Sequence, residues 1–126
     1  MYRVEIFTRE DGAFIASSKG YEFIIDAKAG GITPPDTFLA SLGSCMGVCI
    51  RKYFQGLNIQ LGDFKIMLEA EFSKEKPICF NKINVNIDFK DRQLDERRRQ
   101  ALLAFVKNCP IHNTLKSNPE IQINIV

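Results

Sequence analysis

The fold of this chain is decided by residues 36 to 55, DTFLASLGSCMGVCIRKYFQ. Apolar side chains recur there every three or four residues, at Phe38, Leu42, Cys45 or Met46, Cys49 and Tyr53. This spacing is the period of one helix face, and Gly56 is a natural stop. The uncharged run from Thr37 to Ile50 has only 14 residues. A bilayer needs about 20 apolar residues, so we predict a buried helix and no membrane span.

A second face of this helix carries small residues: Ala40, Gly43, Ser44 and Gly47. Each glycine inside a helix costs about 1 kcal/mol relative to alanine. Small residues let another backbone or side chain come close. We therefore expect another element to pack tightly against this face.

The residues before the helix have the composition of strands and turns. Residues 2–7 and 13–16 predict a hairpin, because turn-forming residues separate them. Residues 21–25 predict a third strand. Glycines and prolines at 29–35 then break regular structure.

The residues after the helix alternate between strand and helix patterns. Strict apolar and polar alternation at 64–72 and at 83–89 predicts two half-buried antiparallel strands. Residues 91–107 read as a second helix and 110–115 as a short third one. Isoleucines at every second position of 121–125 predict a closing strand.

Composition limits the possible classes of protein. The 126 residues suit one compact domain over residues 1–126. A net charge of +2, from 17 basic and 15 acidic residues, gives no electrostatic footprint for nucleic acid or for a membrane surface. The N-terminus lacks the apolar run of a signal peptide, so we expect a cytoplasmic protein whose thiols start reduced.

Two of the four cysteines can carry redox chemistry. Cys45 lies in the middle of the predicted helix, where a cysteine often serves as a small hydrophobic residue. Cys109 precedes Pro110 and would cap the short helix. The N–H groups there favour a thiolate, so we expect a lowered pKa for Cys109. Such a pair can reduce an oxidant through a sulfenic acid and then close a disulfide, provided that the fold brings the sulfurs together.

The same residues leave a metal site open as an alternative. Cys45 and Cys49 share a helix face, and Cys109 and His112 are three residues apart, which makes four possible zinc ligands. Neither spacing matches a common zinc motif, and His112 is more readily a surface or hydrogen-bonding histidine. Otherwise Cys49 and Cys79 read as core or incidental surface thiols, and we expect no metal or other cofactor.

Two motifs carry a resemblance to a known family. The stretch PPDTFLASLGSC at residues 34–45 resembles the helix-opening motif of the OsmC/Ohr family, and NCPIHNTL at residues 108–115 resembles its second cysteine motif. The motifs stand in the family's order, with a matching plan of strands and helices between them. The resemblance extends over nearly the whole chain.

The resemblance implies both a fold and an activity. The fold is α+β, an intertwined homodimer whose central helices pack between antiparallel sheets. Cys45 would attack an organic hydroperoxide and become a sulfenic acid. Cys109 would resolve it as a disulfide, which an external dithiol would reduce.

The chain departs from the family at the groups that activate the attacking thiol. Peroxidase members carry there a glutamate bonded to an arginine. The glutamate position is Pro35 here, and Asp36, one residue later, is a possible auxiliary residue. No arginine occurs between Arg9 and Arg51. An alternative function is therefore redox sensing or ligand binding on the same fold with little turnover.

Overall fold

The computed structural model describes residues 1–28 and 30–126. Position 29, where the predicted break begins, lies outside the described residues. The chain divides into two compact units, residues 1–40 and 41–126. Helix α1 (Pro34–Gly56) contributes its first turns to the first unit and the rest to the second. The single domain over residues 1–126 stays a prediction.

The first unit is built on a three-stranded antiparallel sheet in the order β1-β2-β3. Strands β1 (Glu5–Thr8), β2 (Phe14–Ser18) and β3 (Tyr21–Ile25) follow one another along the chain. The predicted hairpin and third strand are confirmed, although β1 begins three residues later than predicted. Ala16 on the central strand is 2% exposed and forms the centre of this small unit.

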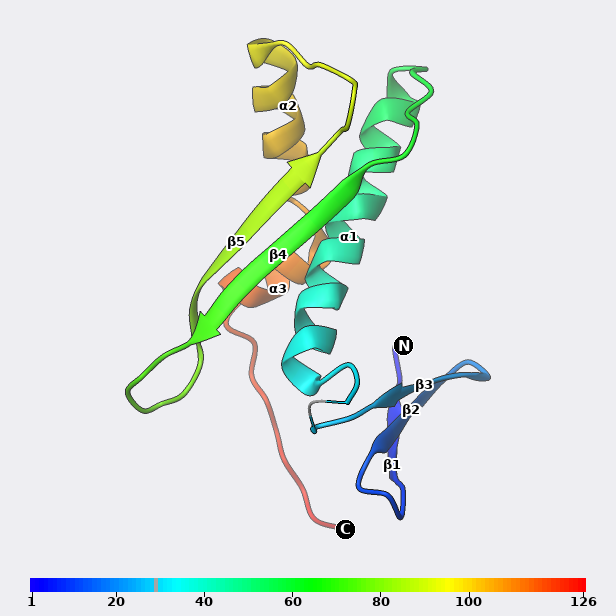
Figure 1. The fold of residues 1–126 in the computed structure, drawn as a ribbon, viewed down its shortest axis with the longest axis vertical. Helices are drawn as coiled ribbons and strands as arrows, with labels where there is room; N and C mark the ends of the chain where they lie inside the picture. Colours follow the sequence, from blue (N-terminus) through cyan, green and yellow to red (C-terminus); the bar gives the residue numbers. More distant parts are fainter. Residues whose placement is uncertain (29) are drawn as a thin grey trace. The chain divides into compact units, whose positions relative to one another are not determined.

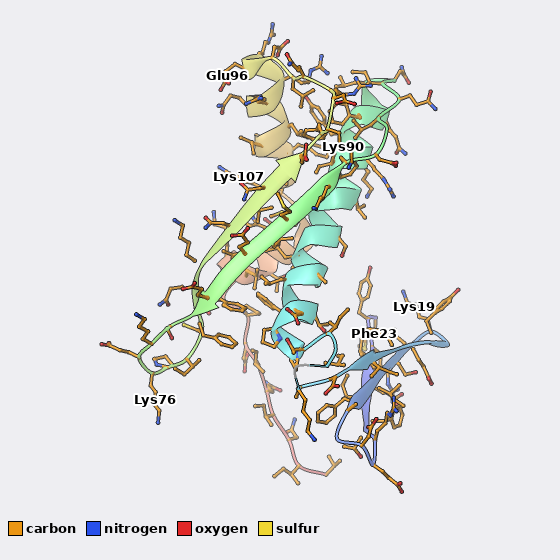
Figure 2. All side chains as sticks on the ribbon, viewed as in Figure 1. Lys19, Phe23, Lys76, Lys90, Glu96 and Lys107 are labelled. Atoms are coloured by element: carbon orange, nitrogen blue, oxygen red, sulfur yellow. The ribbon has the colours of Figure 1, made fainter. Side chains whose placement is uncertain are left out.

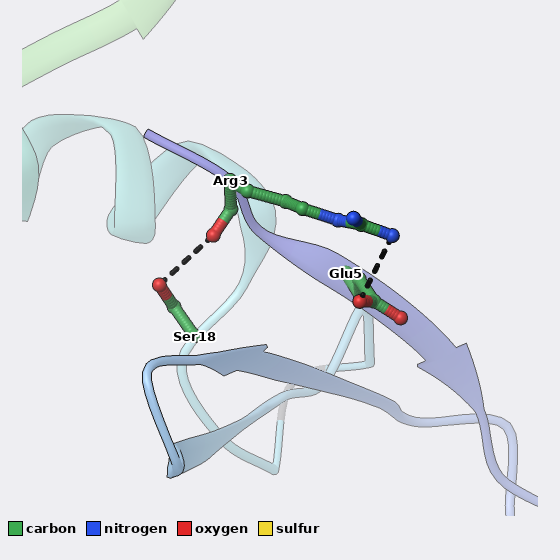
Figure 3. Close-up of polar contacts among 3 residues, drawn as sticks. All are labelled: Arg3, Glu5 and Ser18. Carbon is green, nitrogen blue, oxygen red and sulfur yellow. Dashed lines mark hydrogen bonds and ion pairs between the residues drawn. The ribbon is translucent and has the colours of Figure 1, made fainter. Parts of the chain in front are cut away.

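Polar contacts tie the N-terminus to the central strand (Figure 3). The Ser18 hydroxyl donates to the carbonyl oxygen of Arg3 at 2.9 Å. The Arg3 guanidinium lies 3.4 Å from the Glu5 carboxylate. These groups are exposed, so the ion pair contributes little to stability.

The second unit contains a long antiparallel hairpin of β4 (Lys65–Phe72) and β5 (Phe80–Asp88). Its register places Ile66 opposite Ile87 and Leu68 opposite Val85, so the apolar residues of both strands share one face. Strand β5 starts earlier than predicted because Phe80 pairs with Phe72, with ring centroids 4.6 Å apart.

Helices α1, α2 (Glu96–Val106) and α3 (Pro110–Ser117) pack with this apolar face (Figure 1). The buried core of the unit comes from α1, α2 and the N-cap of α3, and consists of Leu42, Met46, Ile50, Phe54, Leu102, Val106 and Cys109. Charged residues at the outer edges, such as Lys76, Glu96 and Lys107, are exposed (Figure 2). No helix of the described chain is long and apolar enough to cross a membrane.

Helix α2 begins five residues later than the predicted start at Asp91. Lys90 adopts a left-handed conformation with φ 58°, and its N–H donates to the Asp88 side chain at 2.7 Å. This turn leads the chain out of β5, and residues 92–95 form no helix. Asp95 then caps α2 by accepting from the Arg98 N–H at 2.7 Å.

Strand β4 fills the space left by the small residues of α1. A β-carbon added at Gly43 would lie 2.5 Å from Cδ1 of Leu68, and one added at Gly47 would lie 3.5 Å from Cδ1 of Ile66. The predicted tight packing is confirmed at Gly43, whereas the contact at Gly47 would be an ordinary one. Only at Gly43 is there no room for a methyl group.

The predicted closing strand at 121–125 is wrong for the chain by itself. Residues 118–126 are described and form no regular element. Ile121, Ile123 and Ile125 are 78%, 88% and 100% exposed. A strand is stable only when its backbone groups pair with a neighbour, and within the described residues this segment has no pairing strand.

Candidate functional site

The structure brings Cys45 and Cys109 together. Cys45 projects from the middle of α1 and is partly buried, whereas Cys109 is completely buried in the core beside it. Cys45 packs against the core cluster that contains Cys109, and it is close enough to raise the pKa of the Cys109 thiol. Proximity of the two thiols is the first requirement for closing a disulfide during a reaction. Their catalytic roles remain a prediction.

Cys109 caps helix α3, as predicted. Its backbone is extended, Pro110 takes the first helical position, and its sulfur accepts a hydrogen bond from the His112 N–H at 3.3 Å. Proline fits there because the missing N–H would have no intrahelical partner.

The predicted lowering of the Cys109 pKa is wrong. Burial raises the pKa of the Cys109 thiol, because a thiolate loses its hydration there. The His112 N–H lowers this pKa, but by less than burial raises it, and the neighbouring Cys45 and Cys49 raise it further. Sequence reasoning identified the helix cap but could not include the depth at which the cap is buried.

Cys49 lies one turn beyond Cys45 on α1 and packs against the same core. It is partly buried, and burial raises the pKa of the Cys49 thiol. The negative charge of a Cys45 thiolate raises this pKa further, whereas Lys52 lowers it. The sequence predicted a core or incidental residue, although the spacing of four from Cys45 was a signal that the two thiols are neighbours.

The described residues provide no set of ligands for the zinc site that was considered as an alternative. His112 Nδ1 lies 2.7 Å from the Lys107 carbonyl oxygen, so the ring is held by a hydrogen bond to the backbone. Across residues 1–28 and 30–126, no three His, Cys, Asp or Glu side chains are grouped so as to hold a metal ion.

Asp36 has a structural task at the start of α1. Its carboxylate accepts from the Thr33 N–H at 3.0 Å and from the Thr33 hydroxyl at 2.8 Å, and the Asp36 N–H points to that hydroxyl at 3.4 Å. This reciprocal pair is a capping box. These bonds lower the pKa of Asp36. They also explain why α1 begins at Pro34, two residues earlier than predicted.

Two features of the second unit lie apart from these thiols. Cys79 is exposed after the β4–β5 turn, where its thiol donates to Oδ1 of Asn81 at 3.3 Å. An open cavity of about 630 Å³ lies between β5 and α2, and none of its lining residues is a cysteine. We therefore do not assign Cys79 or this cavity to the site of Cys45 and Cys109.

The comparisons with known proteins give the family. The model of the family described as OsmC-like protein matches residues 26–124, which is most of the chain. The chain belongs to the OsmC-like family. This confirms the resemblance read from the two cysteine motifs. No curated protein sequence matches this OsmC-like chain.

Solved OsmC-like structures share its α+β fold. An OsmC-like protein from Mycoplasma pneumoniae is 22% identical, with a TM-score of 0.79 over 100% of this chain and 96% of that one. The organic hydroperoxide resistance protein OhrB of Bacillus subtilis is 22% identical, with a TM-score of 0.62 over 94% and 92%. An organic hydroperoxide resistance protein OsmC from Legionella pneumophila is 19% identical, with a TM-score of 0.66 over 94% and 90%.

Proposed function

We propose that this chain is a thiol-dependent peroxidase that reduces organic hydroperoxides. The observation that carries the proposal is the placement of the partly buried Cys45 against the core cluster that contains the buried Cys109. Two relatives with the same fold are organic hydroperoxide resistance proteins, which supports the choice of oxidant. The cysteine motifs stand in the order that the family resemblance implies.

The reaction would use the two thiols in sequence. The Cys45 thiolate attacks an oxygen of the hydroperoxide, the O–O bond breaks, and an alcohol leaves after taking up a proton. Cys45 then carries a sulfenic acid. The Cys109 sulfur attacks the Cys45 sulfur, water leaves, and a disulfide forms. An external dithiol supplies two electrons and two protons to restore both thiols.

The surroundings of the two sulfurs suit these different tasks. Cys45 is partly exposed and can meet a substrate, whereas Cys109 is shielded from solvent oxidants. A raised pKa keeps Cys109 protonated at neutral pH, and a thiol must lose its proton to attack. We therefore expect resolution to be slow at neutral pH relative to attack by an ordinary exposed thiol.

A redox sensor is the second candidate function, and Asp36 is the observation that favours it. The Asp36 carboxylate is held by Thr33, and the chain has neither the glutamate nor the arginine of peroxidase members at the positions where the family carries them. A sensor would be oxidised once to the same disulfide and would turn over little. The number of peroxides consumed per chain separates the two functions.

We also propose that the protein works as an intertwined homodimer. The chain exposes 10568 Å², whereas two separate globular units of these sizes would together expose roughly 8,000 Å². The excess, roughly 2,500 Å² per chain, is of the size that obligate homodimers bury. Exposed apolar residues in both units, such as Phe23 (Figure 2) and Ile123, would be covered.

A reducing compartment suits this activity. All four cysteines are free, and an external dithiol is needed for each cycle. We therefore place the proposed reaction in the cytoplasm.

The test is a turnover assay. Protein with dithiothreitol and cumene hydroperoxide should consume many equivalents of peroxide, and Cys45→Ser should abolish this consumption. Cys79→Ser is the matched control, because it removes an exposed thiol outside the site. Equal rates in wild type and Cys45→Ser would refute the proposal, and consumption that stops at one or two equivalents despite dithiothreitol would favour the sensor.

A further inference from the structure

Cys109 has two cysteine neighbours on α1. Cys45 and Cys49 both pack against the core cluster that contains Cys109, and both are close enough for their charges to act on it. Of these two neighbours, only Cys45 takes part in the proposed reaction with Cys109. Cys49 is thus a partly buried thiol without a task, next to the proposed disulfide.

Geometry restricts which of these thiols can be bonded to one another. Residues four apart on a helix have Cβ atoms about 5–6 Å apart. A disulfide requires about 3.5–4.5 Å between Cβ atoms. Cys45 and Cys49 therefore cannot join without distorting α1. Cys109 lies at the N-cap of α3, so the helix spacing of α1 does not fix its distance to Cys45 or to Cys49. It is therefore the thiol with which each of them can form a disulfide in turn.

We propose that Cys49 is a third redox residue, which attacks the Cys45–Cys109 disulfide and takes over Cys109 as its partner. This inference rests on the proposed function, since that disulfide must form first. Cys45 is returned to the thiol form while the chain still holds a disulfide. A second hydroperoxide can then be reduced before any external dithiol acts.

The charges around Cys49 favour this order of events. In the reduced protein, a Cys45 thiolate raises the pKa of Cys49. Once Cys45 is in a disulfide it carries no charge, so this effect disappears, while burial, the largest cause of the raised pKa of Cys49, and Lys52, which lowers that pKa, both remain. A larger fraction of Cys49 is then thiolate, the form that attacks a disulfide, than before Cys45 was oxidised.

The exchange balances without a further reagent. Cys49 loses its proton to solvent, its sulfur bonds to the Cys109 sulfur, and the Cys45–Cys109 bond breaks. Cys45 leaves as a thiolate and takes up a proton. No electrons are gained or lost overall, and the oxidant remains the hydroperoxide of the first step.

The chain allows a direct test because Met46 separates Cys45 from Cys49 and Met67 separates Cys49 from Cys109. Cyanogen bromide cleaves after methionine, here after Met1, Met46 and Met67, and gives the fragments 2–46, 47–67 and 68–126. Cys79 shares the last fragment with Cys109, so a Cys79→Ser background is used throughout. Protein without dithiol is treated with cumene hydroperoxide, blocked with N-ethylmaleimide, cleaved in acid and weighed by mass spectrometry.

The linked fragments report each disulfide. We expect the pair 2–46 with 68–126 to appear first, and 47–67 with 68–126 to grow as the first pair declines. The second pair should be lost completely in Cys49→Ser and in Cys45→Ser. The proposal is overturned if the first pair persists, no second pair forms, and Cys49 is found carrying the maleimide. A link between 2–46 and 47–67, or a second pair that forms equally fast in Cys45→Ser, also overturns it.

Peroxide stoichiometry gives an independent reading. Without dithiol, the parent protein should consume two equivalents, the second leaving a sulfenic acid on Cys45, whereas Cys49→Ser should stop at one. Equal stoichiometry overturns the exchange. If the parent protein consumes no peroxide and forms no disulfide, the proposed function itself has failed. If it consumes one equivalent and shows only the first pair, this inference alone has failed.

Discussion

The sulfur of Cys109 accepts a hydrogen bond from the backbone N–H of His112 at 3.3 Å, and yet the Cys109 thiol has a raised pKa. The hydrogen bond and the helix terminus favour the thiolate, while complete burial disfavours it more strongly. The cap therefore orients Cys109 without activating it.

This balance predicts that disulfide closure accelerates with pH. Burial is the largest cause of the raised pKa and persists after Cys45 is oxidised, so closure should rise about tenfold per pH unit below the pKa of Cys109. Quenched-flow mixing at pH 7, 8 and 9 with maleimide blocking measures the rate. A rate independent of pH over this range would mean that Cys109 is already a thiolate.

Removal of the resolving thiol should preserve the first intermediate. In Cys109→Ala we expect a Cys45 sulfenic acid that persists for much longer and reacts with dimedone, because the buried partner that would attack it is gone. The adduct is located by mass spectrometry, with Cys79→Ser as the control that closes normally. Loss of the sulfenic acid from Cys109→Ala as fast as from wild type would contradict the resolving role.

Two glycines of α1 should respond oppositely to alanine. Gly43→Ala places a methyl group against Leu68, an overpacking cost of about 1–3 kcal/mol that outweighs the gain of about 1 kcal/mol in helix propensity. We expect a net loss of about 1 kcal/mol. Gly47→Ala meets only ordinary contact with Ile66 and should gain up to about 1 kcal/mol. Urea unfolding measures both, and equal midpoints would contradict the packing difference.

Asp36 should stabilise the start of α1 through its ionised carboxylate. The lowered pKa of Asp36 means that this contribution is present above the unfolded value near 3.8 and is lost as pH falls through the folded pKa. Asp36→Asn should lower the melting temperature at pH 7, and the difference from wild type should vanish in acid. A difference that stays constant with pH would contradict this assignment.

The same variant tests the auxiliary role of Asp36. Its peroxide consumption is measured at a temperature where circular dichroism shows it fully folded. A lower rate under those conditions supports a role in catalysis, while an equal rate leaves Asp36 as a helix cap.

The homodimer predicts a specific response in the C-terminal segment. Analytical ultracentrifugation should give twice the chain mass of 14.3 kDa. Replacement of Ile121, Ile123 and Ile125 by lysine should shift the protein towards the monomer, because their apolar surface would no longer be buried. Lysine at the alternate positions, Gln122 and Asn124, is the matched control. A wild-type monomer would contradict the dimer.

Much of this fold could be predicted from local signals. The helix at 36–55, the alternating strands and the cap at Cys109 all follow from periodicity or from one or two adjacent residues, and each is present. The start of α2 was missed because Asp95 has an extended backbone and caps the helix, which therefore begins at Glu96. The closing strand was missed because alternation shows that a segment can be a strand without supplying a partner.

The sequence by itself determined which residues could act: a cysteine on a helix face, a second at a helix cap, and the family to which both motifs belong. Only the tertiary structure decided their state. It placed Cys45, Cys49 and Cys109 around one core, and it buried the cap deeply enough to reverse the expected direction of the Cys109 pKa. A helix cap is a property of neighbouring residues, whereas desolvation depends on every element packed around the sulfur.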